Sequence, residues 1–269
     1  MANLLRLARF RDKDRSFYAL LEGDDRALPL SADPFAGDPL AALSGARGRA
    51  VPVDGWERLP PCRPSKIVGI GRNYRDHAAE LGHAVPEVPL LFMKPPSALL
   101  PPGGVIRLPR DSRRVDFEGE IGVVIGRTAR DVPESRARDF ILGYACVNDV
   151  TARDLQKKDG QFTRAKGFDS FCPFGPAIAV GLRPETLRVE TFVNGGRRQS
   201  APASSMIFGI EVLVSFVSHI MTLLPGDLIA TGTPEGVGPL EPGDEVTVSI
   251  EGIGRLTNRV EPAPTPSEG

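Results

Sequence analysis

The segment 115–125 combines reactive side chains with a strand-like pattern. Its sequence, VDFEGEIGVVI, alternates apolar residues with Asp116, Glu118 and Glu120. Because successive side chains of a β-strand point to opposite faces, we expect one strand here that carries these carboxylates on a single face. Like charges at that spacing repel one another, and a hard divalent cation would make the arrangement favourable. A solvated acidic face of an antiparallel strand gives the same pattern, so both interpretations are open at this point.

A further carboxylate could complete such a metal site. Asp149 comes two residues after an apolar segment that we expect to form a strand over 141–147, and a side chain can project from a strand end. An aspartate that caps a turn or a helix has the same sequence context. Together with Glu118 and Glu120, Asp149 would give an oxygen-only ligand set, which favours magnesium, manganese or calcium over zinc.

A histidine and a glutamate at helical spacing could supply a base. His77 and Glu80 are three residues apart within 73–81, which has a composition compatible with a helix, so they would share one face. A carboxylate that orients an imidazole raises its basicity and fixes its tautomer, as the activation of water requires. A solvated helix face is the alternative.

Two other features could bind an anion. Lys166 could place a positive charge near a substrate carboxylate or enolate, although most isolated lysines are simply solvated. The glycine-rich segment 231–238, TGTPEGVG, follows an apolar segment and could bring backbone amides close to an anion. Ordinary turns have the same composition.

Composition excludes several classes of partner. The 33 basic and 34 acidic residues nearly cancel, so the chain lacks the charge expected for binding nucleic acid or an anionic membrane. The 3 cysteines are far apart in the sequence and suit a reducing compartment. Charged residues interrupt the N-terminal segment before an apolar signal region could form. We therefore expect a cytoplasmic protein whose partner is a small molecule.

Short strands and few helices are expected around these residues. Residues 1–60 are predicted to form a small β-rich domain, and a proline-rich linker over 52–64 leads to a larger domain over 61–269. Apolar residues recur at helical spacing over 210–224, which predicts the clearest helix. The expected class is α+β, mainly β. The expected strands are 4–10, 16–21, 26–30, 66–70, 115–125, 141–147, 177–180 and 189–194.

Taken in order, these motifs resemble those of the fumarylacetoacetate hydrolase family. The resemblance runs from about residue 66 to about residue 260 and is specific at the family level. The matching segments are 71–74 (GRNY) with His77 and Glu80, 92–95 (FMKP), 116–120 (DFEGE), 148–156 (NDVTARDLQ), 165–169 (AKGFD), and 224–227 (LPGD) with 231–234 (TGTP).

The resemblance implies a mixed β-sandwich roll, a homodimer, and an Mg²⁺ or Mn²⁺ ion. The oxygen-only ligand set allows Ca²⁺ as a further option. The residues that match the metal ligands are Glu118, Glu120 and Asp149. The match makes His77 and Glu80 a water-activating dyad. It assigns Lys166 to catalysis and substrate binding. The remaining substrate-binding positions that it implies are Arg72, Asn73, Tyr74, Gln156, Thr231, Gly232 and Thr233.

The resemblance also implies a small 2-oxo or enol dicarboxylate substrate, but it does not select one reaction. Hydrolysis, decarboxylation and ketonisation all pass through an enolate that a divalent ion can stabilise. We expect hydrolysis of a carbon–carbon bond in an acylpyruvate-type 2-oxo acid, because the dyad of His77 and Glu80 supplies the base that hydrolysis needs. The alternatives are a 2-hydroxyhepta-2,4-diene-1,7-dioate isomerase, an oxaloacetate decarboxylase, and a non-catalytic metal-dependent binding protein.

Overall fold

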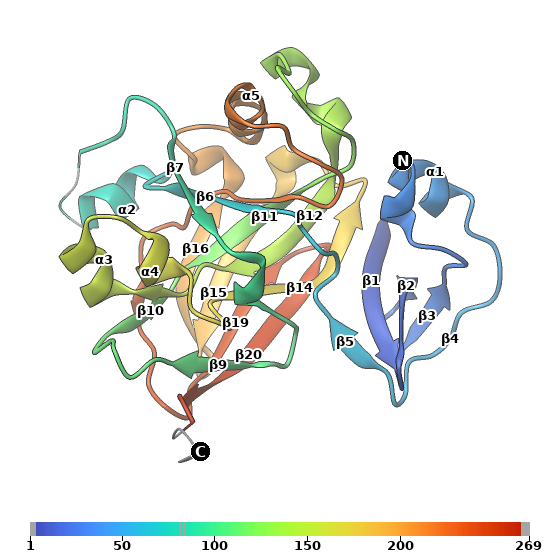
Figure 1. Cartoon of the computed structure of the whole chain (residues 1–269), viewed down its shortest axis with the longest axis horizontal. Helices are drawn as coiled ribbons and strands as arrows, with labels where there is room; N and C mark the ends of the chain where they lie inside the picture. Colours follow the sequence, from blue (N-terminus) through green and yellow to red (C-terminus); the bar gives the residue numbers. More distant parts are fainter. Residues whose placement is uncertain (1–3, 81, 83, 265–269) are drawn as a thin grey trace.

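The computed structural model describes residues 4–80, 82 and 84–264 (Figure 1). Strands dominate these residues and form three sheets, so the predicted α+β, mainly β class is confirmed. Within the described part of the chain, no helix combines the length and apolar character needed to cross a membrane.

The largest sheet runs through the whole molecule. Its strand order is β4-β3-β2-β1-β14-β12-β11-β17-β6-β7, and two further strands, β5 and β8, pair with β1 and β14. The strands in this order are β4 (Val51–Pro52), β3 (Arg26–Pro29), β2 (Arg15–Glu22), β1 (Leu5–Asp12), β14 (Cys172–Val180), β12 (Ile141–Asn148), β11 (Gly119–Ile125), β17 (Leu228–Ala230), β6 (Ile67–Gly71) and β7 (Leu90–Lys94), with β5 (Glu57–Leu59) and β8 (Leu99–Leu100) beside them.

Two smaller sheets accompany it. The five-stranded sheet has the order β16-β15-β19-β20-β9, and the three-stranded sheet has the order β13-β10-β18. Their strands are β16 (Gly196–Pro202), β15 (Arg188–Val193), β19 (Glu245–Ile250), β20 (Gly254–Pro262) and β9 (Val105–Leu108), then β13 (Thr151–Ala152), β10 (Val115–Phe117) and β18 (Gly238–Pro239).

The helices are short and lie between strands. The α-helices are α1 (Pro39–Ser44), α2 (Arg75–Glu80), α3 (Arg153–Asp159), α4 (Thr163–Lys166) and α5 (Ile210–Ile220). The 3-10 helices are η1 (Pro34–Ala36), η2 (Pro96–Ala98), η3 (Glu134–Phe140), η4 (Pro184–Thr186) and η5 (Ala203–Ser205).

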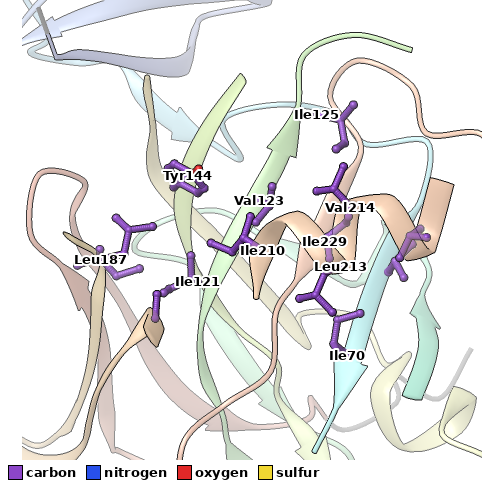
Figure 2. Packing of buried hydrophobic residues seen from close by; sticks show 14 of the residues in the cluster. Ile70, Ile121, Val123, Ile125, Tyr144, Leu187, Ile210, Leu213, Val214 and Ile229 are labelled. Carbon is purple, nitrogen blue, oxygen red and sulfur yellow. The ribbon is translucent and has the colours of Figure 1, made fainter. Parts of the chain in front are cut away.

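The main core lies between the large sheet, the five-stranded sheet and α5. Figure 2 shows Ile121 and Val123 of β11 near Ile210 of α5, and Leu213 of the same helix near Ile229 of β17. The opposite face of β11 is also covered, because its Val124 belongs to a second buried cluster. Both faces of this central strand are therefore inaccessible to solvent.

The N-terminal strands extend the large sheet. β1 pairs with β14 through Leu5 to Leu7, and β5 covers the rest of the same edge by pairing with Arg9 to Arg11. Part of the predicted linker over 52–64 is therefore a strand, which covers an edge that would otherwise be open. Figure 1 shows the N-terminal unit, β1 to β5 with α1, on one side of the molecule. The division into domains at residue 60 stays a prediction.

The expectation of one continuous strand over 115–125 is wrong. β10 and β11 belong to different sheets, and Glu118 lies between them. A side chain at Gly119 would have its Cβ only 1.9 Å from the Thr191 hydroxyl, so the chain passes close to β15 at the break. The interpretation as a solvated acidic face is wrong too. Asp116, Glu118 and Glu120 are buried, with exposed fractions of 0%, 5% and 1%.

The helix predicted over 210–224 ends early, at Ile220. Met221 has an extended backbone, and Leu223 then forms a bridge to Ala129. Leu213 is fully buried as predicted, whereas Ile220 is 53% exposed. The other predicted strands agree with the structure to within a few residues, except that β14 begins at Cys172 rather than at residue 177. The predicted helix 73–81 is α2, and its last predicted residue, Leu81, lies outside the described residues.

Candidate metal centre and active site

Three carboxylates meet where β10, β11 and β12 come together. β11 pairs with β12 so that Gly119 lies opposite Asn148, which brings the flanking acidic residues to one place. The Asp149 amide donates to the Glu118 carbonyl at 2.8 Å, and this bond fixes the two segments to each other. One ligand oxygen from each of Glu118, Glu120 and Asp149 lies within 4.8 Å of the others. The structure therefore brings together the predicted metal ligands.

Asp116 does not join this group. Arg114 binds it through two hydrogen bonds of 2.9 and 3.1 Å, and Arg153 binds it through a third of 3.0 Å. The break between β10 and β11 thus separates Asp116 from Glu118 and Glu120, with which it was expected to share a strand face.

Buried cations surround two of the three carboxylates. The Lys166 ammonium donates to Glu118 at 2.8 Å and to Asp149 at 2.5 Å. Lys94 donates to Asp149 at 2.6 Å, and Arg153 donates to Glu118 at 2.5 Å. All three basic residues are buried, so these are charge-assisted hydrogen bonds away from bulk water.

The third carboxylate has a different environment. Glu120 accepts a hydrogen bond of 2.8 Å from the Gly232 amide and forms no ion pair with any residue that the structure describes. Burial and the charges of Asp149 and Glu118 raise the pKa of Glu120 well above its usual range. Burial also tends to raise the pKa of Glu118, but the charges of Lys166 and Arg153 outweigh it and hold that pKa far below the ordinary value. Of the three carboxylates, Glu120 is thus the one without a cationic partner among the described residues.

The donor set fits a divalent cation. Its atoms are carboxylate oxygens, which are the ligands that hard ions such as Mg²⁺, Mn²⁺ and Ca²⁺ prefer. A cation would neutralise Glu120. The Tyr74 hydroxyl is buried with no hydrogen-bond partner among the described residues, and Glu120 is among the charges that raise its pKa after burial. This region therefore holds a hydroxyl group without a hydrogen-bond partner and a carboxylate without a cationic partner among the described residues, which is typical of a site that binds an ion and its water.

His77 and Glu80 form the predicted pair on α2. His77 Nδ1 lies 3.2 Å from Glu80 Oε2, and the other Glu80 oxygen accepts from the Gly236 amide at 3.1 Å. His77 is 4% exposed, so Glu80 orients a ring that is largely removed from water. If Nδ1 carries the proton, Nε2 is left as the acceptor.

A cavity of about 580 Å³ connects the dyad with Glu118 and Glu120, whereas Asp149 does not line it. The predicted site residues in its wall are Arg72, His77, Glu80, Glu118, Glu120, Gln156, Lys166 and Thr233. Arg114 and Lys157 add positive charge to this wall, and Phe92 and Phe162 form an aromatic side whose ring centroids are 5.6 Å apart. A larger cavity of about 770 Å³, between α1 and β12, contains none of these residues.

The remaining predicted substrate-binding residues do not line this cavity. The Asn73 side chain donates to the Thr231 carbonyl at 2.8 Å, and the Thr231 hydroxyl donates to the Ile121 carbonyl at 2.9 Å. Gly232 has φ of 97°, and a Cβ there would lie 2.7 Å from the Asn73 side chain. In the structure these residues hold the loop that presents the Gly232 amide to Glu120. Their contact with a substrate stays a prediction, as does that of Tyr74.

Sequence reasoning missed three residues of the site. Lys94 lies in a matched motif, but no role was expected for it; it is buried against Asp149. Arg153 joins Asp116 to Glu118 and also binds Gln156 at 2.7 Å. Gln199 of β16 bonds the Gly119 amide at 3.0 Å and the Thr233 hydroxyl at 2.8 Å. A lysine at the end of an apolar strand was the one available signal, because a buried lysine requires an acidic partner.

Known proteins resemble this chain along nearly its whole length. A sequence model described as fumarylacetoacetate (FAA) hydrolase C-terminal matches residues 66–261, and one described as Rv2993c-like, N-terminal matches residues 5–55. Protein Rv2993c of Mycobacterium tuberculosis is 46% identical over 260 residues, which cover 95% of this chain and 98% of that protein.

Solved structures agree with these sequence matches. The structure named 5-carboxymethyl-2-hydroxymuconate delta-isomerase from Mycobacterium smegmatis has a TM-score of 0.86 and 45% identity, and covers 96% of this chain and 99% of that chain. The structure named 2-hydroxyhepta-2,4-diene-1,7-dioate isomerase from Mycobacterium marinum has a TM-score of 0.87 and 44% identity, and the match covers 97% of this chain and 100% of that chain.

Proposed function

The chain belongs to the fumarylacetoacetate hydrolase family, and we propose that it is a divalent-metal-dependent enzyme that hydrolyses a carbon–carbon bond in an acylpyruvate-type 2-oxo acid. The observation that carries this proposal is the dyad of His77 and Glu80 in the wall of the cavity that also contains Glu118 and Glu120. A positioned base beside a carboxylate cluster is the combination that hydrolysis of such a substrate requires.

Glu118, Glu120 and Asp149 would hold the ion, for which we propose Mg²⁺ or Mn²⁺, with Ca²⁺ as a further option. When bound, such an ion supplies a Lewis acid that draws electrons from the carbonyl and carboxylate oxygens of a 2-oxo acid. Lys94 and Lys166 hold Asp149 through Nζ atoms 2.6 and 2.5 Å from its two oxygens, and this orients the carboxylate before any ligand arrives.

His77 would act as the general base. Glu80 holds Nδ1, so Nε2 can take a proton from a water molecule in the cavity. The hydroxide oxygen then bonds to the acyl carbonyl carbon of the substrate. The adjacent carbon–carbon bond breaks, its electron pair passes into the pyruvate fragment as an enolate, and a proton returns to that carbon. The products are a carboxylic acid and pyruvate, which together account for the acylpyruvate and one water.

Basic side chains in the cavity wall would bind the substrate's carboxylates. Arg72 has φ of 57°, an uncommon backbone conformation that places a guanidinium in this wall. Gln156 accepts from Arg153 at 2.7 Å, so its amide group is oriented before binding. Lys166 lies 4.9 Å from the centroid of the Phe92 ring, which leaves its charge little exposed to solvent. We propose Arg72 and Gln156 as contacts of the carboxylates and Lys166 as the charge beside the developing enolate.

A second candidate is the isomerisation of a 2-hydroxy-diene dioate, which the names of the two similar solved structures favour. That reaction moves a proton between carbons and consumes no water, so the same His77 could carry the proton. Assays of the purified protein with Mg²⁺ and with Mn²⁺ separate the candidates. The substrates to compare are acylpyruvates, the diene dioate and oxaloacetate. Our proposal expects acylpyruvate cleavage to be the fastest, and turnover of none of the substrates would support a binding protein instead.

His77→Ala tests the role of the dyad. Loss of a positioned general base typically lowers a rate by about a hundredfold to ten-thousandfold, so acylpyruvate cleavage should fall by that factor. Decarboxylation of oxaloacetate should change far less, because it needs no attacking water. Glu80→Gln should reproduce part of the loss. His219→Ala is the matched control, since His219 is exposed on α5 and does not line the cavity. Cleavage by His77→Ala at the wild-type rate would refute the hydrolytic role.

A further inference from the structure

A second polar cavity, of about 260 Å³, lies in the N-terminal unit and shares no lining residue with the active-site cavity. Its wall contains three arginines, Arg9, Arg15 and Arg63, and one acidic residue, Asp33. Tyr18 and the hydroxyl groups of two serines complete the polar part of the wall. β1 and β2, which contribute Arg9, Arg15 and Tyr18, lie in the N-terminal unit in Figure 1.

Arg9 has an unusual environment for a buried arginine. It is 6% exposed, it pairs across the sheet with Tyr18, and its guanidinium lies 6.0 Å from the centroid of the Tyr18 ring. It forms no hydrogen bond and no ion pair with any residue in the described ranges. Arg153, which is 4% exposed, instead binds Asp116, Glu118 and Gln156. No Arg9 nitrogen is among the fully enclosed polar atoms that lack a partner, so the Arg9 guanidinium keeps contact with the cavity and has no protein partner there among the described residues.

The residues around Arg9 do not neutralise it. Burial lowers the pKa of Arg9, and the neighbouring charge of Arg63 lowers it further. Asp33 acts in the opposite direction, but no basic nitrogen among the described residues lies within ion-pair distance of its carboxylate. One Asp33 oxygen instead accepts from the Phe35 amide at 2.8 Å. The cavity therefore has an excess of positive charge.

We propose that this cavity is a binding site for one small oxyanion, either inorganic phosphate or a carboxylate, held by Arg9 and Arg63. Both anions present oxygens that a guanidinium can bind in a fork-like geometry. Burial raises the pKa of Tyr18, so its hydroxyl stays protonated and can donate to the same anion. The site is independent of the proposed reaction, because it uses none of the residues of the metal centre.

The location gives the anion a structural role. Arg9 and Arg15 belong to β1 and β2, whereas Arg63 lies between β5 and β6, where the chain enters the rest of the molecule. A Cβ at Gly226 would lie 3.8 Å from the Arg63 carbonyl, so this segment lies against the turn before β17. An anion bound by Arg9 and Arg63 would therefore link the N-terminal unit to the rest and stabilise the folded chain.

Calorimetric titration of the full-length protein tests the proposal. The protein is dialysed free of phosphate and metal into a chloride buffer, and sodium phosphate and sodium acetate are added separately at constant ionic strength. Phosphate stabilises many proteins without binding a specific site, so the readout is the difference between variants. The variants are Arg9→Gln and Arg63→Gln. The matched control is Arg11→Gln, on the same strand, whose arginine is bound to Glu57 and does not line the cavity.

Wild type and Arg11→Gln should bind one anion. Arg9→Gln and Arg63→Gln should bind it roughly 10- to 100-fold more weakly, as expected for the loss of charge-assisted hydrogen bonds. At an anion concentration ten times the wild-type Kd, the melting temperature of wild type should rise by roughly 2–5 °C more than that of Arg9→Gln. Comparison of the phosphate and acetate titrations shows whether the site binds phosphate or a carboxylate. Binding of neither, or equal binding by wild type and Arg63→Gln, overturns the proposal even if Arg9→Gln does not fold.

Discussion

Replacing Glu120 by glutamine should uncouple the stability of the protein from divalent metal. Glutamine keeps the size of the side chain and an oxygen that can accept the hydrogen bond that the Gly232 amide donates to Glu120 at 2.8 Å in the wild type. The change removes the carboxylate that has no cationic partner among the described residues and whose pKa is raised by burial and by Asp149 and Glu118. The metal-free variant should therefore be at least as stable as the metal-free wild type at pH 8.

The effect on metal binding follows from the number of ligands. Glu120 is one of the three carboxylates that could hold the ion. Loss of a group that only hydrogen-bonds to a metal ligand already lowers metal affinity by about 10- to 100-fold, so loss of a direct ligand should lower the affinity by about 100-fold or more. At a metal concentration 100 times the wild-type Kd, the ion stabilises wild type by about 2.7 kcal/mol and the variant by about 0.4 kcal/mol. These values correspond to rises in Tm of roughly 5–11 °C and roughly 1 °C.

Thermal unfolding with and without Mg²⁺ or Mn²⁺ measures both values. Asp116→Asn is the control, because Asp116 belongs to the same motif but binds Arg114 and Arg153 instead of facing the other carboxylates. Its Tm should be lower than that of wild type, while its response to metal should be kept. An equal rise in Tm for Glu120→Gln and wild type would show that the ion binds elsewhere, and the assignment of the metal centre would fail.

Three further predictions concern the pH dependence of metal binding, the packing of α5 and the oligomeric state. The pKa of Glu120 is raised in the fold, so the protonated carboxyl stabilises the metal-free fold fully below about pH 4.5, and this stabilisation is lost as the pH rises through the raised pKa. A metal ion that binds Glu120 must therefore displace a proton, and calorimetry should show that the affinity for Mn²⁺ increases with pH. An affinity that is flat from about pH 5 to 8 would contradict this. Leu213→Ala should lower the free energy of unfolding by about 2–5 kcal/mol and Ile220→Ala by less than about 1 kcal/mol, since only Leu213 is buried; similar losses in urea denaturation would contradict the exposure of Ile220. We also predict a homodimer, and a monomer mass in light scattering across micromolar concentrations would refute it.

Local sequence patterns suggested much of this site but left other interpretations open, and the resemblance to a known family selected among them. The metal ligands, the dyad and Lys166 lie in short motifs whose residue types already suggest oxygen ligands, a base and a fixed charge. Helical spacing placed His77 and Glu80 on one side of a helix, where they are 3.2 Å apart. The geometry of the dyad depends on neighbours in the sequence, which is why it could be predicted. Asp149 and Lys166 come from other segments than Glu118 and Glu120, so their grouping rested on the family resemblance.

Features that depend on distant residues could not be predicted in the same way. The break at Glu118 exists because Gly119 passes close to Thr191, which is 72 positions further along the chain, and because Asp116 binds Arg153. A glycine within a strand pattern signals such a close approach but not its partner. In the same way, the pairing of Lys94 with Asp149 joins segments 55 residues apart. Period and composition do not identify the distant partner in either contact.

The most direct test of the metal centre is anomalous X-ray diffraction from crystals of the protein soaked in Mn²⁺. We predict one anomalous peak at the site, about 2.0–2.6 Å from a carboxylate oxygen of each of Glu118, Glu120 and Asp149, in the cavity that also contains His77. A strong peak elsewhere in the molecule, with none among these carboxylates, would contradict the account.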